Sequence, residues 1–487
     1  MKNKLRVTDL ITIDEVENWK AEDCITIKAG TGTGKSYFIK NTLYDVAKRQ
    51  NKRILMLIHR SNCIEQFINE ITRDKKHDVI DIKTYQKLEY KELNTYINDL
   101  SEYQYICCDE FHYFMGDASF SKTTDMSLDL ILSQTFATKI FMSATGDKMK
   151  TFINKVKNIK TIDYELPINF EFINDLLFFN TDDTFEILIE DAIKRNEKSI
   201  FFIQSAKKAY KLFKKYEDYC LFNCSKNNKT YYKYIDKDKI KNMLINEKFE
   251  ELILITTTCM DAGVNLIDVD LRHIICEVED TGTLIQCIGR KRIQNEYDNI
   301  NVYLKIINNN SLGGKETQLK KKIHMAEFLK THTVKEFITK FPRQYDYSNI
   351  VYDDIVLENN KGTKKINELM YYKTEEDLCE IQIIKEFGKY GYCEYLKNLF
   401  GVEFYSVIEE QNKTNELKEY LDSIIGKKLY KDEQKELIEK IDLKVNRRLQ
   451  KSYDKLNDGL KMINLNYMIL PKKSNNNRYW IVERFEI

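Results

Sequence analysis

Short apolar runs alternate with amphipathic stretches along about the first three fifths of the chain. Each run is short enough for a strand buried on both faces, and the stretches between them have the spacing of amphipathic helices. The apolar runs lie at residues 24–27, 54–58, 103–108, 139–142, 199–203, 252–255 and 302–307. Strands that alternate with helices are typical of α/β domains with parallel sheets. The pattern therefore predicts two such domains in tandem.

Breaks in this pattern predict the domain boundaries. Leu166 and Pro167 follow the strand-like residues 162–165 and mark a hinge, and a stretch rich in asparagine and glycine at residues 308–314 ends the second block. Beyond it the pattern is helical. We expect a first α/β domain at residues 1–165, a second at 166–310, a helical accessory region at 311–415 and a separate C-terminal unit at 416–487.

The C-terminal unit has a distinct order of elements. Helical patterns, the first interrupted by Gly426, precede two strand patterns, at residues 416–441, 447–462, 467–470 and 479–482. Lys472, Lys473 and Arg478 lie between the two strands. Helices followed by a hairpin with a basic tip have the order of a winged helix, a nucleic-acid-binding unit. A helical packing domain with a solvated charged face is the alternative.

Composition narrows the class of protein. The chain has 487 residues, of which 43% are hydrophobic and 31% charged, enough for several cores. It has no apolar run long enough to span a membrane, and the basic residues 1–6 are not followed by the apolar core of a secretory signal. The odd number of cysteines, eleven, with several in apolar runs, indicates reduced thiols in a cytoplasmic protein. Cys220 and Cys224 have a metal-like spacing, but no second pair supports zinc.

Charge excludes one kind of nucleic-acid binder. The 77 basic and 76 acidic residues nearly cancel, for a net charge of +1, so a uniformly basic surface is excluded and a local basic cleft is not. The abundance of lysine, asparagine, isoleucine and tyrosine, with only 3 prolines, indicates an AT-rich bacterial, plasmid or phage gene.

The most informative stretch is the glycine-rich loop at residues 29–36. It follows an apolar run and precedes a helical pattern, which is the context of a phosphate-binding loop. Backbone N–H groups of such a loop point at an anion, the lysine reaches the β- and γ-phosphates, and the hydroxyl after it binds Mg²⁺. We expect ATP phosphates to contact Gly30, Thr31, Gly32, Thr33, Gly34, Lys35 and Ser36. A merely flexible loop is the competing interpretation.

Two adjacent carboxylates end the apolar run at 103–108. Ligands bind at the carboxyl ends of parallel strands, so Asp109 is placed to act as a second Mg²⁺ ligand beside Ser36. Glu110 would then orient and deprotonate the attacking water.

These residues, in this order, resemble the motifs of superfamily 2 helicases and translocases, in their DExH branch. The segments that carry the resemblance are, for motifs I, Ia, Ib, II, III, IV, V and VI, residues 29–36, 54–60 with Gln66, 83–86, 109–112, 143–145, 199–205, 252–265 and 286–292. They cover about residues 8–310. The resemblance implies that both α/β domains are RecA-like and that ATP hydrolysis occurs in the cleft between them.

The resemblance also implies roles for individual residues. Arg290 and Arg292 are the candidates for an arginine finger, and His112 and Gln286 would bridge motifs II and VI across the cleft. An ordinary structural histidine is the alternative for His112. Further nucleotide contacts fall on Gly263 and Asn265, and contacts with the nucleic-acid strand fall on Arg60, Thr84, Gln86, Ser205 and Thr257.

Two departures from the family pattern matter. Motif VI lacks its usual second glycine, so either Arg292, which we favour, or Arg290 is the finger. The adenine-reading glutamine motif of DEAD-box relatives is not evident before the glycine-rich loop. The resemblance implies an ATP-dependent helicase or translocase, with DNA favoured over RNA as the track because a winged-helix-like tail suits duplex DNA. An RNA helicase and an ATP-gated adaptor that does not unwind are the alternatives; the sequence points to no protein partner.

Overall fold

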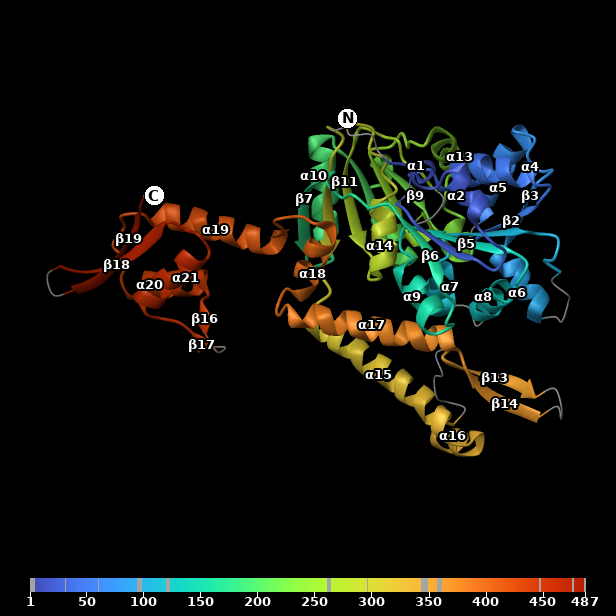
Figure 1. Ribbon diagram of the computed structural model, residues 1–487. Helices are drawn as coiled ribbons and strands as arrows, with labels where there is room; N and C mark the ends of the chain where they lie inside the picture. The colour runs from blue at the N-terminus through green and yellow to red at the C-terminus, as the bar shows by residue number, and fades with distance from the viewer. Residues whose placement is uncertain are drawn as a thin grey trace. The chain divides into compact units, whose positions relative to one another are not determined.

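The computed structural model describes residues 5–30, 32–59, 61–93, 99–119, 123–260, 264–295, 297–342, 349–356, 361–445, 448–474 and 477–485. The chain divides into two compact units (Figure 1), Met1–Leu176 with Asn180–Tyr405, and Leu177–Phe179 with Ser406–Ile487. No helix in these described ranges is both long and apolar enough to cross a membrane.

The first domain is built on a six-stranded sheet in the order β3-β2-β4-β5-β1-β6. Its strands are β1 (Cys24–Lys28), β2 (Ile54–Ile58), β3 (Ile80–Thr84), β4 (Tyr105–Asp109), β5 (Thr138–Ser143) and β6 (Thr161–Glu165), all paired in parallel. The glycine-rich loop follows β1, the two adjacent carboxylates lie at the end of β4, and β5 is the strand between β1 and β4. Parallel strands end at the same edge, so the sheet brings these segments together.

Helices cover both faces of this sheet, which explains why a central strand such as β2 is apolar on both faces. Ile54, Met56 and Ile58 of β2 belong to one buried cluster, whereas Leu55 and Leu57 belong to another. The helical segments are α1 (Val7–Leu10), α2 (Ile13–Asn18), α3 (Lys35–Phe38), η1 (Ile39–Leu43), α4 (Tyr44–Arg49), α5 (Ser61–Arg73), α6 (Tyr85–Leu93), α7 (Tyr113–Gly116), η2 (Asp117–Ser119), α8 (Thr124–Leu132) and α9 (Asp147–Lys155).

The second domain repeats this architecture, with a sheet in the order β15-β7-β12-β11-β8-β10-β9. Its strands are β7 (Ile173–Phe179), β8 (Lys198–Ile203), β9 (Cys220–Asn223), β10 (Ile253–Thr256), β11 (Leu271–Glu277), β12 (Ile300–Lys305) and β15 (Ser406–Val407). Its helical segments are α10 (Asp183–Arg195), α11 (Ala206–Lys215), η3 (Glu217–Tyr219), α12 (Lys229–Tyr232), α13 (Lys237–Asn246), η4 (Thr258–Met260) and α14 (Thr281–Ile288). The expected fold class, two tandem parallel-sheet α/β domains followed by a mainly helical region, is confirmed.

The region after β12 contains more than helices. It consists of α15 (Asn309–Thr331), α16 (Val334–Lys340), β13 (Val351–Val356), β14 (Lys361–Ile366), α17 (Glu368–Glu386) and α18 (Gly391–Phe400). The antiparallel pair β13–β14 was not expected. The break expected at residues 308–314 is also wrong in part: Asn308 caps α15, and Gly313 and Gly314 lie inside that helix. The Asn308 side chain accepts a hydrogen bond from the backbone N–H of Ser311. This residue therefore starts a helix, where the sequence predicted an irregular break.

This accessory region is anchored on the first domain, although it follows the second in sequence. Helices α15 and α17 lie side by side (Figure 1). Met325, Phe337 and Leu369 belong to the same buried cluster as Tyr85 and Phe152 of the first domain. Farther along, Phe400 of α18 makes a ring contact with Phe170 in the connection between the domains, at 4.9 Å between centroids. The accessory region therefore contacts both the first domain and the connection between the two domains.

The C-terminal unit has its own core. It contains α19 (Ile408–Ile424), α20 (Lys431–Ile441), β16 (Lys444–Val445), β17 (Arg448–Leu449), α21 (Tyr453–Met462), β18 (Tyr467–Ser474) and β19 (Asn477–Arg484). Leu421, Leu437, Leu456 and Val482 are fully buried together. As expected, the chain turns between two helices at Gly426, whose φ is 71°, and a hairpin ends the unit. The third helix starts at Tyr453, later than expected, because β16 and β17 precede it.

Candidate nucleotide site and strand cavity

The glycine-rich loop takes the backbone conformation that its glycines allow. Gly32 and Gly34 have φ values of 77° and 91°, in the left-handed region that disfavours residues with a side chain. The Lys35 ammonium donates to the carbonyl oxygens of Ala29 and Gly30 at 2.8 and 3.1 Å, which places it inside the loop. Ser36 lies in the first turn of α3. Thr31 lies outside the described residues.

The two carboxylates lie where β4 ends. Asp109 is the last residue of the strand, and Glu110 follows with a φ of 49°, a conformation that non-glycine residues seldom adopt. The Ser143 hydroxyl donates to Glu110 Oε2 at 3.4 Å, and His112 Nδ1 lies 3.4 Å from the same oxygen. The strained turn thus aims Glu110 at Ser143, the last residue of β5, and at His112.

The pKa values of Asp109 and Glu110 are shifted in opposite directions. Burial and the neighbouring charge of Glu110 raise the pKa of Asp109 to about 7. Burial also works against the charge on Glu110, but the bond from His112 and the charge of Lys35 hold the pKa of Glu110 below its usual range. Glu110 is therefore ionised, as a base must be, and Asp109 would gain from a nearby cation.

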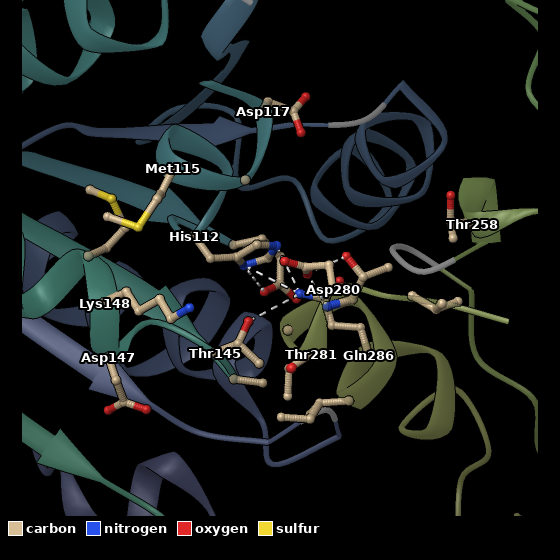
Figure 2. Close-up of a pocket in the computed structure, with 18 of the residues that line it drawn as sticks. His112, Met115, Asp117, Thr145, Asp147, Lys148, Thr258, Asp280, Thr281 and Gln286 are labelled. Atoms are coloured by element: carbon tan, nitrogen blue, oxygen red, sulfur yellow. Dashed lines mark hydrogen bonds and ion pairs between the residues drawn. The ribbon is translucent and has the colours of Figure 1, made fainter. Parts of the chain in front are cut away.

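His112 and Gln286 meet across the cleft between the two domains (Figure 2). Gln286 Nε2 lies 2.8 Å from His112 Nε2, and His112 Nδ1 lies 2.9 Å from Ser143 Oγ. Because the amide nitrogen of Gln286 can only donate, His112 Nε2 accepts and Nδ1 carries the proton toward Ser143 and Glu110. The amide of Gln286 also approaches Thr145 Oγ1, at 3.5 Å. A hydrogen-bonded path therefore runs from the second domain to Glu110.

Arg290 leaves part of its guanidinium without a partner. Its side chain is 3% exposed, and it donates to the carbonyl oxygens of Gln286 and Val264 at 3.1 and 3.3 Å. Nη2 is buried and has no hydrogen-bond partner among the described residues. An unpaired buried donor with a positive charge costs free energy unless an anion binds it.

Arg292 lies against the glycine-rich loop. A Cβ added to Gly32 would be 3.5 Å from Arg292 Nη1. Arg292 Nε donates to Asn265 Oδ1 at 2.9 Å, and Asn265 donates in turn to Glu247 at 2.9 Å. Asn265, expected to contact nucleotide, therefore faces Arg292 in this structure. Gly263 lies outside the described residues.

The cations crowd one another in this site. Burial and repulsion from Arg290 lower the pKa of Arg292 to about 10. Burial also lowers the pKa of Lys35, an effect that Glu110 and Asp109 oppose. Cations from both domains thus converge on the glycine-rich loop, an arrangement suited to a polyphosphate.

A magnesium ion fits the donors at hand. Ser36 supplies a hydroxyl oxygen and Asp109 a carboxylate, and Mg²⁺ commonly takes one or two protein ligands together with substrate phosphates. The raised pKa of Asp109 marks a carboxylate that such a cation would stabilise. Among the described residues no group of three or more His, Cys, Asp or Glu could hold a metal alone.

A second cavity, of about 880 Å³, lies between the two domains beside the nucleotide cleft. Gln86 and Thr257, two of the residues predicted to contact a strand, line it, and the contact itself stays a prediction. Thr84 and Ser205 instead cap helices, accepting from the backbone N–H groups of Lys87 at 3.0 Å and Lys208 at 3.4 Å. Arg60 lies outside the described residues.

Sequence reasoning did not identify several residues that line this cavity. They come from the stretch that runs from the end of β9 into α13 and include Asn223, Lys226, Asn227, Asn228, Lys237 and Lys241. The segment belongs to no family motif. Its run of lysines and asparagines was the only signal available.

Comparison with known proteins gives distant structural likeness. No protein-family model matches the chain, and no curated protein matches its sequence. Among solved structures, S. cerevisiae Dbp5 bound to RNA and ADP BeF3 aligns with a TM-score of 0.45 and 16% identity, over 58% of this chain and 79% of that one. Mss116p bound to ssRNA and AMP-PNP aligns with a TM-score of 0.45 and 14% identity, over 63% of this chain and 70% of that one. At such values the likeness assigns no function.

Proposed function

We propose that this protein is an ATP-dependent helicase or translocase that couples ATP hydrolysis between its two α/β domains to movement along a nucleic-acid strand. The observation that carries the proposal is that Lys35 and Arg292 lie at one glycine-rich loop, with Arg290 near enough to act on the charge of Lys35 and its buried Nη2 unpaired among the described residues. A γ-phosphate supplies the anion that this arrangement lacks.

The residues of the cleft divide the work of phosphoryl transfer. Lys35 and the arginines stabilise the charge that develops on the transferred group. Glu110 accepts a proton from water, and its orientation is held by Ser143 and His112. Bound Mg²⁺, held by Ser36 and Asp109, would neutralise phosphate charge.

Closure of the cleft would couple this chemistry to motion. Lys35, Asp109 and Glu110 lie on the first domain, whereas Gln286, Arg290 and Arg292 lie on the second. Turnover therefore requires both domains together, and product release favours their separation. The bond between Gln286 and His112 links α14, the helix that precedes the two arginines, to the residue that orients the base.

The second cavity is suited to a strand held by its backbone. Amide and hydroxyl groups of Gln86, Thr257 and Asn227 line it together with Lys226 and Lys241. Such groups bind phosphates and sugars without reading bases, so binding should be salt-sensitive and weakly dependent on sequence.

The C-terminal unit favours DNA as the track. Leu429 bridges Trp480, so a short third strand segment joins the hairpin. Apart from the short pair β16–β17 between α20 and α21, the order helix, strand segment, two helices, hairpin is that expected of a winged helix. Lys472, Lys473 and Arg478 are exposed toward the hairpin tip. We propose that this unit binds duplex DNA at a junction. Removing residues 416–487 should leave ATP hydrolysis intact and weaken duplex binding or unwinding at least about tenfold; equal unwinding by the truncated and full chains would refute this role.

ATPase assays with different polynucleotides test the proposed function. Magnesium-dependent hydrolysis should rise on addition of single-stranded DNA, and Lys35→Ala should abolish it. Stimulation by RNA alone would replace DNA with RNA as the track. Stimulated hydrolysis without strand separation on a forked duplex would make the protein a translocase or adaptor. Absence of hydrolysis under all conditions would contradict the proposal.

A further inference from the structure

Helix α17 of the accessory region presents a charged face to the cleft. Lys373, Asp377 and Glu380 are spaced so that they share one side of the helix. All three line a cavity of about 700 Å³ in the cleft between the two domains, and Glu110 and Gln286 line the same cavity. No family motif includes these residues.

Glu380 connects three other elements through its carboxylate. Oε2 lies 2.6 Å from Lys148 Nζ on α9. Oε1 accepts from Thr281 Oγ1 on α14 at 2.5 Å and from the Tyr395 hydroxyl on α18 at 3.2 Å. The Glu380 side chain is 17% exposed, so these are sheltered contacts. We call the contacts among Glu380, Lys148 and Thr281 the Glu380 bridge.

The two ends of the Glu380 bridge lie close to the catalytic segments. Lys148 is in the first turn of α9, directly after the residues 143–145 that contact Glu110 and Gln286. Figure 2 shows Lys148 and Thr281 on opposite sides of the cleft, one from each domain. Thr281 is the first residue of α14, the helix that carries Gln286 and leads to Arg290.

The charges around the bridge are matched within the chain. Lys148 also lies 3.6 Å from Asp377, and Lys373 pairs with Asp377. Asp280 caps α14 by accepting from the backbone N–H of Thr283 at 2.7 Å. Burial opposes the charge on Lys148, but Glu380 and Asp377 raise its pKa above the usual value. The bridge therefore holds charged groups in place without any external ligand.

We propose that Glu380 is a positioning residue that couples cleft closure to the accessory helices. This inference rests on the proposed function. The carboxylate satisfies Lys148 of the first domain and Thr281 of the second at the same time, so it favours the arrangement in which the arginines approach the glycine-rich loop.

The bridge is separate from the attachment of α17. Leu369 and Met370 near the start of that helix are buried in the cluster shared with the first domain, and these apolar contacts hold α17 there. Glu380 extends from α17 to α14 through its contact with Thr281, in a different part of the helix from these apolar contacts. Loss of Glu380 should therefore weaken coupling while the fold persists.

Hydrogen exchange tests the bridge directly, with or without nucleotide. In Glu380→Ala, amides in the first turns of α9 and α14 should exchange at least about threefold faster than in the natural chain. Glu386→Ala is the matched control, because it removes an exposed carboxylate from the end of the same helix. Equal exchange in the two variants would overturn the proposal, whatever the enzyme does.

Kinetics then test the consequence of the bridge. Glu380→Ala should lower kcat at saturating ATP and nucleic acid at least about fivefold and leave KM for ATP within about twofold, because Glu380 does not contact the glycine-rich loop. Lys148→Met should have a similar effect, and the double variant should be no worse than either single one. Glu380→Gln, which keeps an acceptor for Thr281, should fall between.

The outcomes separate this inference from the proposed function. If the natural chain hydrolyses ATP and Glu380→Ala matches Glu386→Ala in kcat, the coupling role is refuted and the ATPase stands. If the natural chain hydrolyses no ATP, the proposed function fails, and exchange alone decides whether the bridge joins α9 and α14. Additive effects of Lys148→Met and Glu380→Ala would show that the two residues act independently, against the proposal.

Discussion

The nucleotide side of the cleft and the partly exposed Glu380 bridge are both clusters of charge, but their charges are paired differently. Near the glycine-rich loop, Arg290 keeps a buried donor that has no partner among the residues the structure describes, and burial and repulsion lower the pKa of Arg292. At the bridge, Lys148 gains basicity because Glu380 and Asp377 surround it. One cluster needs an anion from outside the chain, and the other is complete without one.

This difference separates a binding site from a structural contact. Buried unpaired cations are costly, so a fold retains them where a ligand neutralises them. Charges that are already paired between helices do not call for a ligand, and they fix how those helices lie relative to one another. Substitutions on the nucleotide side should therefore change catalysis strongly, and those at the bridge should change it moderately.

The largest effect is expected for Glu110→Gln. The amide keeps the shape of the side chain but cannot accept a proton from water, so kcat should fall by about 10²–10⁴ while ATP still binds. Single-turnover hydrolysis measures this. Full turnover by the variant would remove Glu110 from the role of base.

The arginines come next. Arg290→Ala and Arg292→Ala should each lower kcat by about 10²-fold or more and leave ATP affinity within about tenfold, because the charge on the phosphate grows mainly in the transition state. Arg272→Ala, at an exposed position on β11, is the matched control. An arginine whose loss leaves kcat normal is not the finger. The pair of variants therefore also shows which arginine of the shortened motif VI has that role.

A smaller effect is expected where the two domains touch. Gln286→Ala removes the bond to His112 and should lower kcat about tenfold, with His112→Ala similar and the double variant no worse. Steady-state kinetics of the natural chain, the two single variants and the double variant give a double-mutant cycle. Additive losses would mean that the contact between His112 and Gln286 transmits nothing to Glu110.

The smallest effect concerns stability and pH. Because the pKa of Asp109 is raised to about 7 in the folded chain, above the value of about 3.9 expected when unfolded, the fold loses stability as pH rises from about 4 to about 7, and the loss is complete above that range. Asp109→Asn should therefore raise the midpoint of thermal unfolding at pH 8 and gain less at pH 6, in chelator and without nucleotide. Asp45→Asn, at an exposed site on α4, is the control. A gain that is independent of pH would contradict the assigned cause.

Local patterns predicted the parts that depend on neighbours in sequence. The apolar run before residues 29–36 predicted the strand that aims the loop, and Asp109 at the end of its strand was placed correctly at the same sheet edge. Gln86 and Thr257 line the second cavity, whereas the roles of Thr84 and Ser205 as helix caps were not anticipated.

The rest depends on contacts between distant segments. A helical pattern at residues 311–415 does not reveal that Met325 and Phe337 complete the core of the first domain, because apolar spacing marks a buried face without naming its partner. The same holds for Glu380, whose partners lie far away in sequence on α9 and α14. The pair β13–β14 escaped notice because its strands are rich in lysine and aspartate and lack an apolar run.

Strand retention by Glu110→Gln tests the central claim most directly, since it measures the coupling of nucleotide to track without turnover. A labelled single-stranded DNA, or RNA if that is the stimulating polymer, is titrated with the variant in Mg²⁺ and either ATP or ADP. The account predicts a Kd at least about tenfold lower with ATP than with ADP, and loss of that difference when Lys35→Ala is added. Equal affinity in both nucleotides, with ATP shown to be bound, would contradict it.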